Sequence, residues 1–308
     1  GKKVIGYREA LSLSTAPKKM VIVGSGAIGV EFAYFYNAMG VDVTVVEFMP
    51  NIVPVEDIDV SKQLQRSFKK SGIKVMTKSS VEKVDTSGTA CKVLIKTKKG
   101  EETIECDVVL SAVGIDANIE NIGLEEISVA TDQGAITINE FNQTSVPNIY
   151  AIGDVSGPPW LAHLASAQGH VAVEHAAGNT THPVDYSNIP ACTYCQPQVA
   201  SLGMTEATAI DKGHQIKVGK FEFRASGKAL ATGDSTGFVK IVFDETYGEL
   251  LGCHIVGSEA TEMIAELGVA KTLETTWQEI AMTVHAHPTL SEAIMEAALD
   301  AFGQGVHQ

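Results

Sequence analysis

The sequence predicts an α/β protein of more than one domain, and three features of the chain indicate this class. Residues 20–23 form an apolar run that ends at a glycine and is followed by a helix-compatible stretch and a second strand-like segment, the order of a βαβ unit. Residues 114–186 are loops rich in Asn and Gly. After them, strand-like segments precede two helical ones, an order typical of an α+β domain.

The first half of the chain is expected to alternate strands and helices around this βαβ unit. After an amphipathic lead-in, strands are predicted at the apolar or alternating segments 20–23, 41–47, 73–76 and 107–113. Helices are predicted at 27–39 and 64–68, and Gly40 would end the first of them. Residues 81–107 are expected to hold further strands, separated at the turn signals Ser87-Gly88 and Lys99-Gly100.

The second half is expected to become regular only beyond a linker at 184–190. Before the linker, a strand at 149–152 is predicted to meet Gly153-Asp154, and a helix is predicted at 164–177. Beyond it, four strands of an antiparallel sheet and then two helices are predicted at 199–203, 216–223, 237–244, 250–256, 259–274 and 291–302. These expectations divide the chain into segments 1–16, 17–115, 116–186 and 187–308.

The composition is that of an acidic globular protein. The chain has 308 residues, of which 44% are hydrophobic, and a formal charge of −14. An acidic surface repels phosphate backbones and anionic lipids, so neither a nucleic acid nor a membrane is an expected partner. No stretch approaches the ~20 apolar residues of a transmembrane helix. The five cysteines are scattered, which favours a reducing compartment and predicts a cytoplasmic protein.

A glycine-rich loop, G-S-G-A-I-G, lies between a predicted strand and a predicted helix and matches the pattern G-x-G-x-x-G. Gly24 permits the tight turn, Gly26 lets the backbone approach a pyrophosphate, and Gly29 lets helix and strand pack closely. Ala27 and Ile28 open the helix, whose unpaired N–H groups favour phosphate. A tight turn in a sheet that binds no nucleotide is the alternative, but the strand–turn–helix context favours a Rossmann-like dinucleotide site.

An acidic residue closes the strand that follows the glycine loop. Glu47 stands where a carboxylate would accept both ribose hydroxyls, and it would repel a 2′-phosphate. The next residues, Phe48, Met49 and Pro50, include no Arg to receive such a phosphate. NAD is therefore favoured over NADP. On spacing alone, Glu31 just beyond the loop is compatible with an ordinary solvated helix carboxylate.

A second candidate ligand site lies where the predicted strand 149–152 ends. Asp154 would accept hydrogen bonds from a polyol there, although an Asp-initiated turn accounts for it equally well. Ala162 precedes a predicted helix, so backbone N–H groups near it would face an electron-rich ligand atom.

The segment HAHPTLSE at residues 285–292 is the densest candidate for chemistry. Pro288 keeps His287 out of the helical region, and Ser291 would cap the last helix with Glu292 in its first turn. A rigid His beside a carboxylate is an acid–base arrangement, since Glu292 fixes the tautomer and stabilises the imidazolium. A zinc site at H-x-H and a purely structural histidine are the alternatives; no cysteine lies close enough to complete a familiar zinc spacing.

Cys192 and Cys195 form a C-x-x-C pattern, which would fit a redox disulfide or half of a metal site. A catalytic pair normally starts a helix that lowers the thiolate pKa. Here Pro190 precedes the pair and Pro197 follows it. An extended segment with two unconnected thiols is therefore predicted instead.

Three of these motifs together resemble the pyridine nucleotide–disulfide oxidoreductases, most closely the members that oxidise dihydrolipoamide for 2-oxo acid dehydrogenase complexes. The motifs are VIVGSGAIGVE at 21–31, YAIGD at 150–154 and HAHPTLSE at 285–292, so the resemblance covers the whole chain in order. It implies a flavoprotein oxidoreductase that passes electrons from dihydrolipoamide through a redox disulfide and FAD to NAD. The implied partners are the lipoyl domain and a second copy of the chain.

The resemblance also assigns the domains. Residues 17–115 would be a Rossmann-like NAD-binding domain, and 116–186 the remnant of a central domain that contacts FAD. Residues 187–308 would be an α+β interface domain that forms the homodimer, after a lead-in at 1–16.

Residue roles follow from the same resemblance. The implied cofactor contacts are Gly24, Gly26, Ala27, Ile28, Gly29, Glu31, Glu47, Gly114, Asp154 and Ala162. Within this set, Glu47 would hold the adenosine ribose and Glu31 would lie near the nicotinamide, while the last two residues would contact FAD. His287 and Glu292 would be the acid–base pair, serving the active site of the partner subunit. No metal is implied.

Two departures limit the resemblance. Many members carry Gly-Arg-x-Pro-Asn where this chain has GIDAN at 114–118. Nothing in the chain matches the family's first FAD-binding glycine loop or its C-x-x-x-x-C redox pair. The chain is therefore predicted to be a fragment that binds NAD and dimerises without turning over lipoamide. Another reductase of the superfamily, such as an NADH oxidase, is the remaining alternative for the parent protein.

Overall fold

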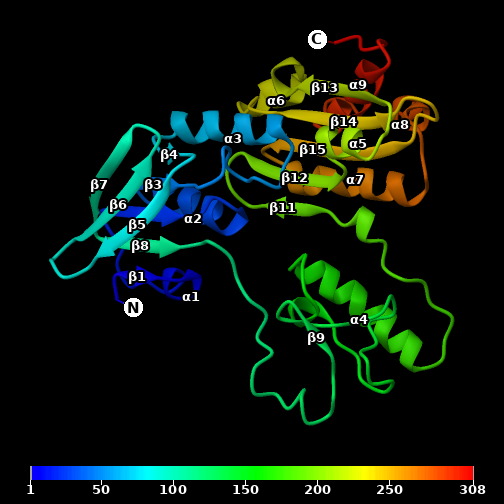
Figure 1. The fold of residues 1–308 in the computed structure, drawn as a ribbon. Coiled ribbons are helices and arrows are strands. Elements are labelled where there is room, and N and C mark those ends of the chain that lie inside the picture. The colour runs from blue at the N-terminus through cyan, green and yellow to red at the C-terminus, as the bar shows by residue number, and fades with distance from the viewer. Residues whose placement is uncertain (1, 308) are drawn as a thin grey trace. The chain divides into compact units, whose positions relative to one another are not determined.

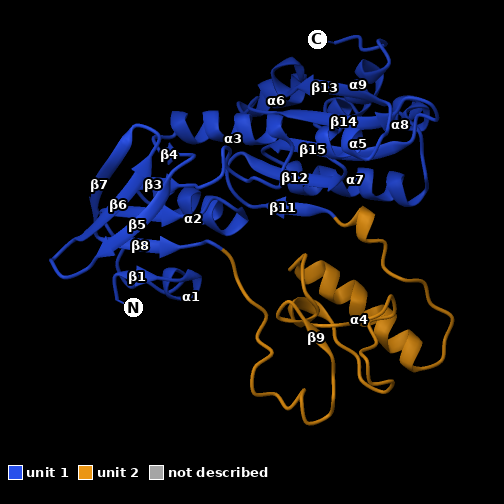
Figure 2. Cartoon of the chain, viewed as in Figure 1, with its two compact units in different colours: residues 1–113, 190–308 blue, residues 114–189 orange. Residues whose placement is uncertain are grey.

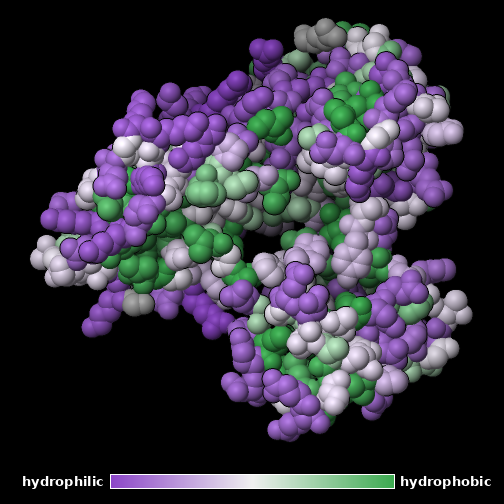
Figure 3. Space-filling model, viewed as in Figure 1, coloured by the Kyte–Doolittle hydropathy of each residue, from purple (hydrophilic) through white to green (hydrophobic). Residues whose placement is uncertain are grey.

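A computed structural model describes residues 2–307, which fold into two compact units (Figures 1 and 2). Unit 1 comprises the described residues up to Val113 and from Pro190 onward, and unit 2 comprises residues 114–189. The face seen in Figure 3 carries many hydrophilic residues (purple), with apolar residues (green) exposed among them. None of the helices within residues 2–307 is long and apolar enough to cross a membrane.

The first domain of unit 1 is built on a five-stranded parallel sheet in the order β1-β8-β2-β3-β4. Its strands are β1 (Val4–Ile5), β2 (Lys19–Val23), β3 (Asp42–Val46), β4 (Lys74–Met76) and β8 (Val108–Ser111). Its helices are α1 (Tyr7–Ala10), α2 (Ala27–Ala38) and α3 (Ile58–Lys70). The predicted βαβ unit is confirmed as β2, α2 and β3, whose strands are almost wholly buried, as expected for a parallel sheet.

Strand β1 lies in a segment for which the sequence pattern predicts only a lead-in. Val4 and Ile5 pair in parallel with Val109 and Leu110 of β8, so the segment adds an edge strand to the sheet. A strand of two residues is too short to show the alternation that identifies a strand in a sequence. Its pairing partner also lies far along the chain.

Two further features complete the first domain. A three-stranded antiparallel sheet contains β5 (Ser80–Asp85), β6 (Cys91–Thr97) and β7 (Gly100–Cys106), as predicted from the turn signals between them. Helix α3 is longer than the predicted segment 64–68. It begins early because the carboxylate of Asp57 accepts a 2.9 Å hydrogen bond from the N–H of Asp59 and so caps the first turn.

The second domain of unit 1 is a five-stranded antiparallel sheet in the order β11-β12-β15-β14-β13. Its strands are β11 (Ala191–Thr193), β12 (Gln198–Gly203), β13 (Ile216–Glu222), β14 (Phe238–Asp244) and β15 (Leu250–Gly257). Its helices are α5 (Glu206–Asp211), α6 (Gly227–Thr232), α7 (Ala260–Thr272), α8 (Trp277–Met282) and α9 (Glu292–Ala301), and a 3-10 turn, η3 (Phe223–Ala225), follows β13. Helix α7 packs on β12 and β15, and α9 on β13 and β14, which confirms the predicted α+β arrangement.

Unit 2 is mostly loops around the helix α4 (Ala162–Ala176). Its other elements are β9 (Thr131–Asp132), β10 (Ala135–Ile136) and the 3-10 turns η1 (Gly153–Ser156) and η2 (Tyr186–Asn188). The strand predicted at 149–152 is wrong. The segment forms only an isolated bridge between Tyr150 and Gln143, because no neighbouring strand within the described residues offers it a continuous partner.

Candidate nucleotide-binding and acid–base sites

The glycine loop joins β2 to α2, and its glycines are placed for different reasons. Gly24 has φ +98°, and a Cβ there would lie 2.3 Å from the carbonyl oxygen of Ala112. A Cβ on Gly29 would lie 2.1 Å from the carbonyl oxygen of Gly24. A Cβ on Gly26, in contrast, would meet nothing within 4 Å. Packing therefore requires the outer two glycines, whereas the middle one borders open space from which a phosphate can approach the backbone.

Helix α2 begins directly after Gly26, which is its N-cap residue and makes no side-chain capping bond. Ala27 and Ile28 are the first two helical residues, so their N–H groups have no partner within the helix. These donors and the positive end of the helix dipole suit a pyrophosphate. The loop thus fits the dinucleotide that the sequence predicts.

Glu47 follows β3 and turns its carboxylate toward the glycine loop. Its Oε2 accepts hydrogen bonds from the backbone N–H of Ser25 at 2.8 Å and from the Ser25 hydroxyl at 2.6 Å. Its Oε1 accepts one from the N–H of Met49 at 2.7 Å. A carboxylate oxygen can accept two hydrogen bonds, so Oε1 keeps capacity for a ribose hydroxyl. Sequence reasoning identified Glu47 but missed Ser25, an unspecified position of the motif.

Glu31 is half-buried on α2 and is not a solvated helix carboxylate. It accepts a 2.8 Å hydrogen bond from the backbone N–H of Tyr194, which follows β11 in the second domain. Burial raises the pKa of Glu31, and the Tyr194 N–H partly offsets this. The contact ties the helix behind the glycine loop to the antiparallel domain.

The other predicted cofactor contacts lie in unit 2. Gly114 is its first residue, with φ +141°. Asp154 is exposed in η1, and Ala162 is exposed as the first residue of α4. The turn η1 packs on α4, and Gln168 fixes it by accepting a 2.7 Å hydrogen bond from the N–H of Gly153. Unit 2 therefore brings a carboxylate and a helix N-terminus to neighbouring elements.

His287 and Glu292 form a hydrogen-bonded pair at the start of α9. His287 Nδ1 lies 2.8 Å from Glu292 Oε1, while Glu292 Oε2 accepts a 2.8 Å hydrogen bond from the N–H of Thr289. The His287 side chain is 77% exposed. The hydrogen bond from the Thr289 N–H has the largest effect on the pKa of Glu292 and lowers it; the hydrogen bond with His287 lowers it further. Ser291 is the N-cap residue and Glu292 lies in the first turn, as predicted, but the Ser291 side chain makes no capping hydrogen bond; Glu292 binds the N–H of Thr289 instead.

His285 has a different environment from His287 although it belongs to the same motif. Its side chain is 5% exposed, and Nε2 lies 2.7 Å from Glu266 Oε1. Its Nδ1 lies 2.9 Å from the carbonyl oxygen of Thr283. Both ring nitrogens are therefore occupied within the protein. Residues 2–307 contain no group of three His, Cys, Asp or Glu side chains arranged to hold a metal ion.

The C-x-x-C segment carries two free thiols, as predicted. Cys192 lies in the extended strand β11 and Cys195 beyond it, and neither forms a disulfide. Burial raises the pKa of Cys195 to about 12, so this thiol is a poor nucleophile.

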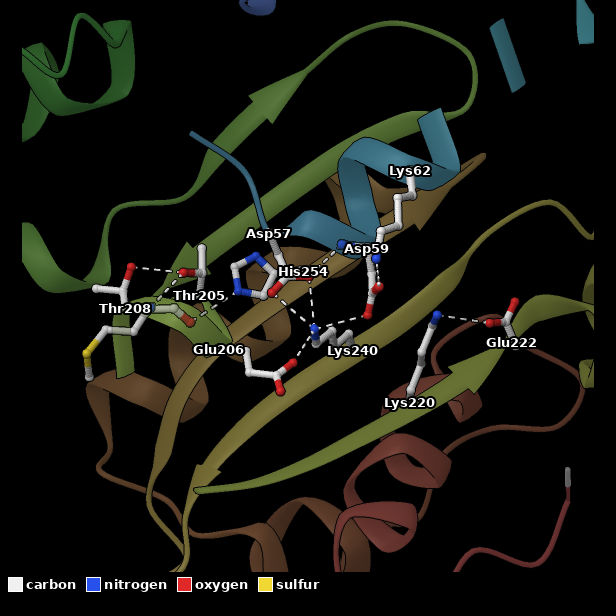
Figure 4. A network of polar contacts seen from close by, with 11 residues as sticks. Asp57, Asp59, Lys62, Thr205, Glu206, Thr208, Lys220, Glu222, Lys240 and His254 are labelled. Carbon is white, nitrogen blue, oxygen red and sulfur yellow. Dashed lines mark hydrogen bonds and ion pairs between the residues drawn. The ribbon is translucent and has the colours of Figure 1, made fainter. Parts of the chain in front are cut away.

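A buried charged group joins the two domains of unit 1 (Figure 4). We call it the Lys240 cluster; it comprises Lys240, Asp57, Asp59 and Glu206. The lysine Nζ lies within 3.1 Å of an oxygen of each carboxylate. Sequence reasoning missed this cluster, since Lys240 and Asp57 are separated by 183 positions and neither belongs to a motif.

A Rossmann-type glycine loop, a carboxylate at the end of the next strand and a separate antiparallel domain are the features of a two-domain dinucleotide-binding protein. Comparison with known proteins agrees: residues 1–169 match the family described as pyridine nucleotide-disulphide oxidoreductase, and residues 189–298 match the dimerisation domain of that family. The chain belongs to the pyridine nucleotide-disulphide oxidoreductase family. This membership implies FAD and a pyridine nucleotide as cofactors.

Individual relatives narrow the comparison. The chain is 49% identical over 306 residues to a dihydrolipoyl dehydrogenase of Rhizobium etli, covering 99% of this chain and 64% of that protein. It is 46% identical to the dihydrolipoyl dehydrogenase of Zymomonas mobilis, covering 100% of this chain and 66% of that protein. The chain thus spans about two thirds of the length of these relatives.

Solved structures share the fold. LpdA from Mycobacterium tuberculosis superposes with a TM-score of 0.89 at 29% identity, covering 96% of this chain and 64% of that one. The flavoprotein disulfide reductase RclA from Escherichia coli also gives 0.89, at 23% identity, with 96% of this chain and 68% of that one covered. The second likeness concerns the fold alone.

Proposed function

We propose that the whole protein is a dihydrolipoyl dehydrogenase that oxidises dihydrolipoamide to lipoamide with NAD as the acceptor. It would act as a homodimer, joined through the antiparallel domain, within a 2-oxo acid dehydrogenase complex. The observation that carries the proposal is the His287–Glu292 pair, because oxidation of a dithiol needs a base that removes a thiol proton. The names of the relatives add support.

The pair has the geometry of an oriented base. The His287 Nδ1–H donates to Glu292 Oε1, so the other ring nitrogen, Nε2, is left as the proton acceptor. The thiol proton of dihydrolipoamide would move to Nε2, and the carboxylate of Glu292 would stabilise the resulting imidazolium. Because the ring is 77% exposed, it is accessible to a site outside its own domain, such as that of a partner subunit.

The nucleotide preference rests on Glu47. Its carboxylate lies at the end of β3 beside the glycine loop and would repel the 2′-phosphate of NADP. Bound FAD and NAD would supply the electron transfer itself. The contribution of this chain is to hold the nucleotide on the glycine loop and to move the thiol proton through His287.

The test is the variant His287→Gln in the full-length protein. We expect a loss of about 10²–10⁴-fold in dihydrolipoamide-dependent NADH formation, the usual contribution of general base catalysis, with NADH–dye reduction retained. His285→Gln is the matched control from the same segment, since its ring is engaged with Glu266. We expect it to lower stability but to change lipoamide turnover only a few-fold. Full lipoamide activity in His287→Gln would reject the proposal and favour another reductase of the family.

A further inference from the structure

Lys240 of the antiparallel domain is held by carboxylates from two domains. It lies on β14 with only 1% of its side chain exposed. Its Nζ lies 2.9 and 3.1 Å from the two oxygens of Asp57 and 3.1 Å from Asp59, both of the parallel domain. It lies 2.7 Å from Glu206 on α5 of its own domain. Figure 4 shows the lysine reaching across the boundary between β14 and the start of α3.

Lys240 and Asp57 form a buried ion pair, since each side chain is only 1% exposed. Burial alone would lower the pKa of Lys240, but Glu206 and Asp57 outweigh it and raise the pKa above its ordinary value. Removing Lys240 leaves the buried charge of Asp57 without a cation, whereas removing Asp57 leaves Lys240 with only the more exposed carboxylates of Asp59 and Glu206. Asp57 is also the N-cap of α3, so the lysine fixes the first turn of that helix.

A chain of hydrogen bonds runs from Asp57 back to the nucleotide loop. The carbonyl oxygen of Asp57 accepts from the N–H of Ser61, whose hydroxyl donates to the carbonyl oxygen of Val53 at 3.5 Å. The N–H of Val53 donates to the carbonyl oxygen of Ser25 at 2.9 Å. Ser25 in turn holds the carboxylate of Glu47. Residues 48–56 therefore form a loop with the ribose acid at one end and Asp57 at the other.

The backbone of this loop is strained at its contact with Ser25. Val53 has φ +41°, a conformation that a β-branched residue rarely adopts. Such a conformation persists only where the surrounding structure holds it. The two ends of loop 48–56 are fixed, at Glu47 by β3 and at Asp57 by the Lys240 cluster. Loss of the second anchor would let the loop relax.

We propose that Lys240 is a positioning residue for the nucleotide site: by holding Asp57, it fixes loop 48–56 and thereby the orientation of Ser25 and Glu47. A side chain of the antiparallel domain then contributes to nucleotide affinity without touching the nucleotide. The inference rests on the proposed binding of NAD to the glycine loop.

The test compares variants of this 308-residue chain. Lys240→Met removes the ion pair but leaves the buried charge of Asp57 without a cation. The double variant Lys240→Met/Asp57→Asn is therefore also made. Asn caps helices as well as Asp does, which preserves the start of α3. The matched control is Lys220→Met: Lys220 lies directly opposite Lys240 on β13 but pairs with Glu222 of its own strand at 3.2 Å.

Two readouts separate positioning from a merely structural role. In the folded double variant we expect amide hydrogen exchange in residues 48–57 to be about tenfold faster, and the Kd for NAD and for ADP-ribose to rise about tenfold. Lys220→Met should change neither. Unchanged Kd and exchange in the double variant, or a loss of stability alone, would overturn the proposal. If the parent chain binds no NAD, the premise that its glycine loop binds NAD fails, and the exchange of residues 48–57 alone decides whether Lys240 fixes the loop.

Discussion

Two neighbouring carboxyl groups at the domain boundary of unit 1 have opposite surroundings. Asp57 faces the antiparallel domain through the ammonium group of Lys240. Glu56 faces it through Ser201, whose hydroxyl donates a 3.1 Å hydrogen bond to Oε1. Glu56 Oε2 is buried with no hydrogen-bond partner among the described residues, although the residue as a whole is partly exposed. One side of the boundary is therefore charge-compensated and the other is not.

The two pKa values differ in direction for this reason. Burial alone would raise the pKa of Asp57, but the hydrogen bonds from Lys240 and from the Asp59 N–H outweigh it and lower the pKa. Burial raises the pKa of Glu56 to about 7; the Ser201 hydroxyl partly offsets this, and the charge of Asp57 adds to it. The opposite directions therefore reflect both the burial of the Glu56 carboxyl and the cation that only Asp57 has within reach.

The largest effect is expected on the compensated side. Asp57→Ala removes both the most deeply buried partner of Lys240 and the cap of α3, and it should lower the free energy of unfolding by about 3 kcal/mol in urea titrations. The control is Asp59→Ala, whose side chain is 32% exposed and whose loss should cost about 1 kcal/mol or less. Equal losses for the two variants would show that burial of the Asp57 pair has no special weight.

The uncompensated side should respond to pH. Because folded Glu56 keeps its proton to higher pH than the unfolded chain, stability should fall as pH rises from about 4.5 to about 7 and level off above. Glu56→Gln removes this dependence. Relative to the parent chain, the variant should gain about 2–3 kcal/mol between pH 5 and pH 8.5, measured by urea unfolding at each pH. Parallel pH profiles for the two chains would mean that Glu56 is ionised throughout.

Features formed by residues close together in the chain were predictable, whereas the contacts across the domain boundary were not. The strand β3 and the acid Glu47 at its end follow from alternation and from the spacing to the glycine loop. The His287–Glu292 pair was predictable for the same reason, as both residues lie in one short segment. These features depend on neighbours in the chain, and the period of the side chains reports them.

The remaining features depend on distant partners. Lys240 is the one polar residue among the first six of β14, and only the fold brings it to Asp57. The strand expected at 149–152 failed in the opposite way, since an apolar run alone does not supply a neighbour to pair with. Strand β1 was missed because two residues carry no period. The sequence pattern thus does not predict which segments pair with one another or which side chains become buried between them.

The smallest effect is expected for an ion pair of the same kind, Lys and a carboxylate, that lies on the solvent-exposed surface. Lys74 and Glu102 form a 2.9 Å pair between β4 and β7 with side chains 50% and 47% exposed. Glu102→Gln should cost less than about 1 kcal/mol, and 1 M NaCl should abolish the difference from the parent chain, because it shortens the screening length to about 3 Å. The cost of Asp57→Ala should persist in the same salt, since the side chain of Lys240 is only 1% exposed and buried pairs are screened much less. Both losses of stability are measured by urea unfolding with and without 1 M NaCl. If the salt reduced them equally, the Lys240 cluster would be solvated rather than buried at the domain boundary.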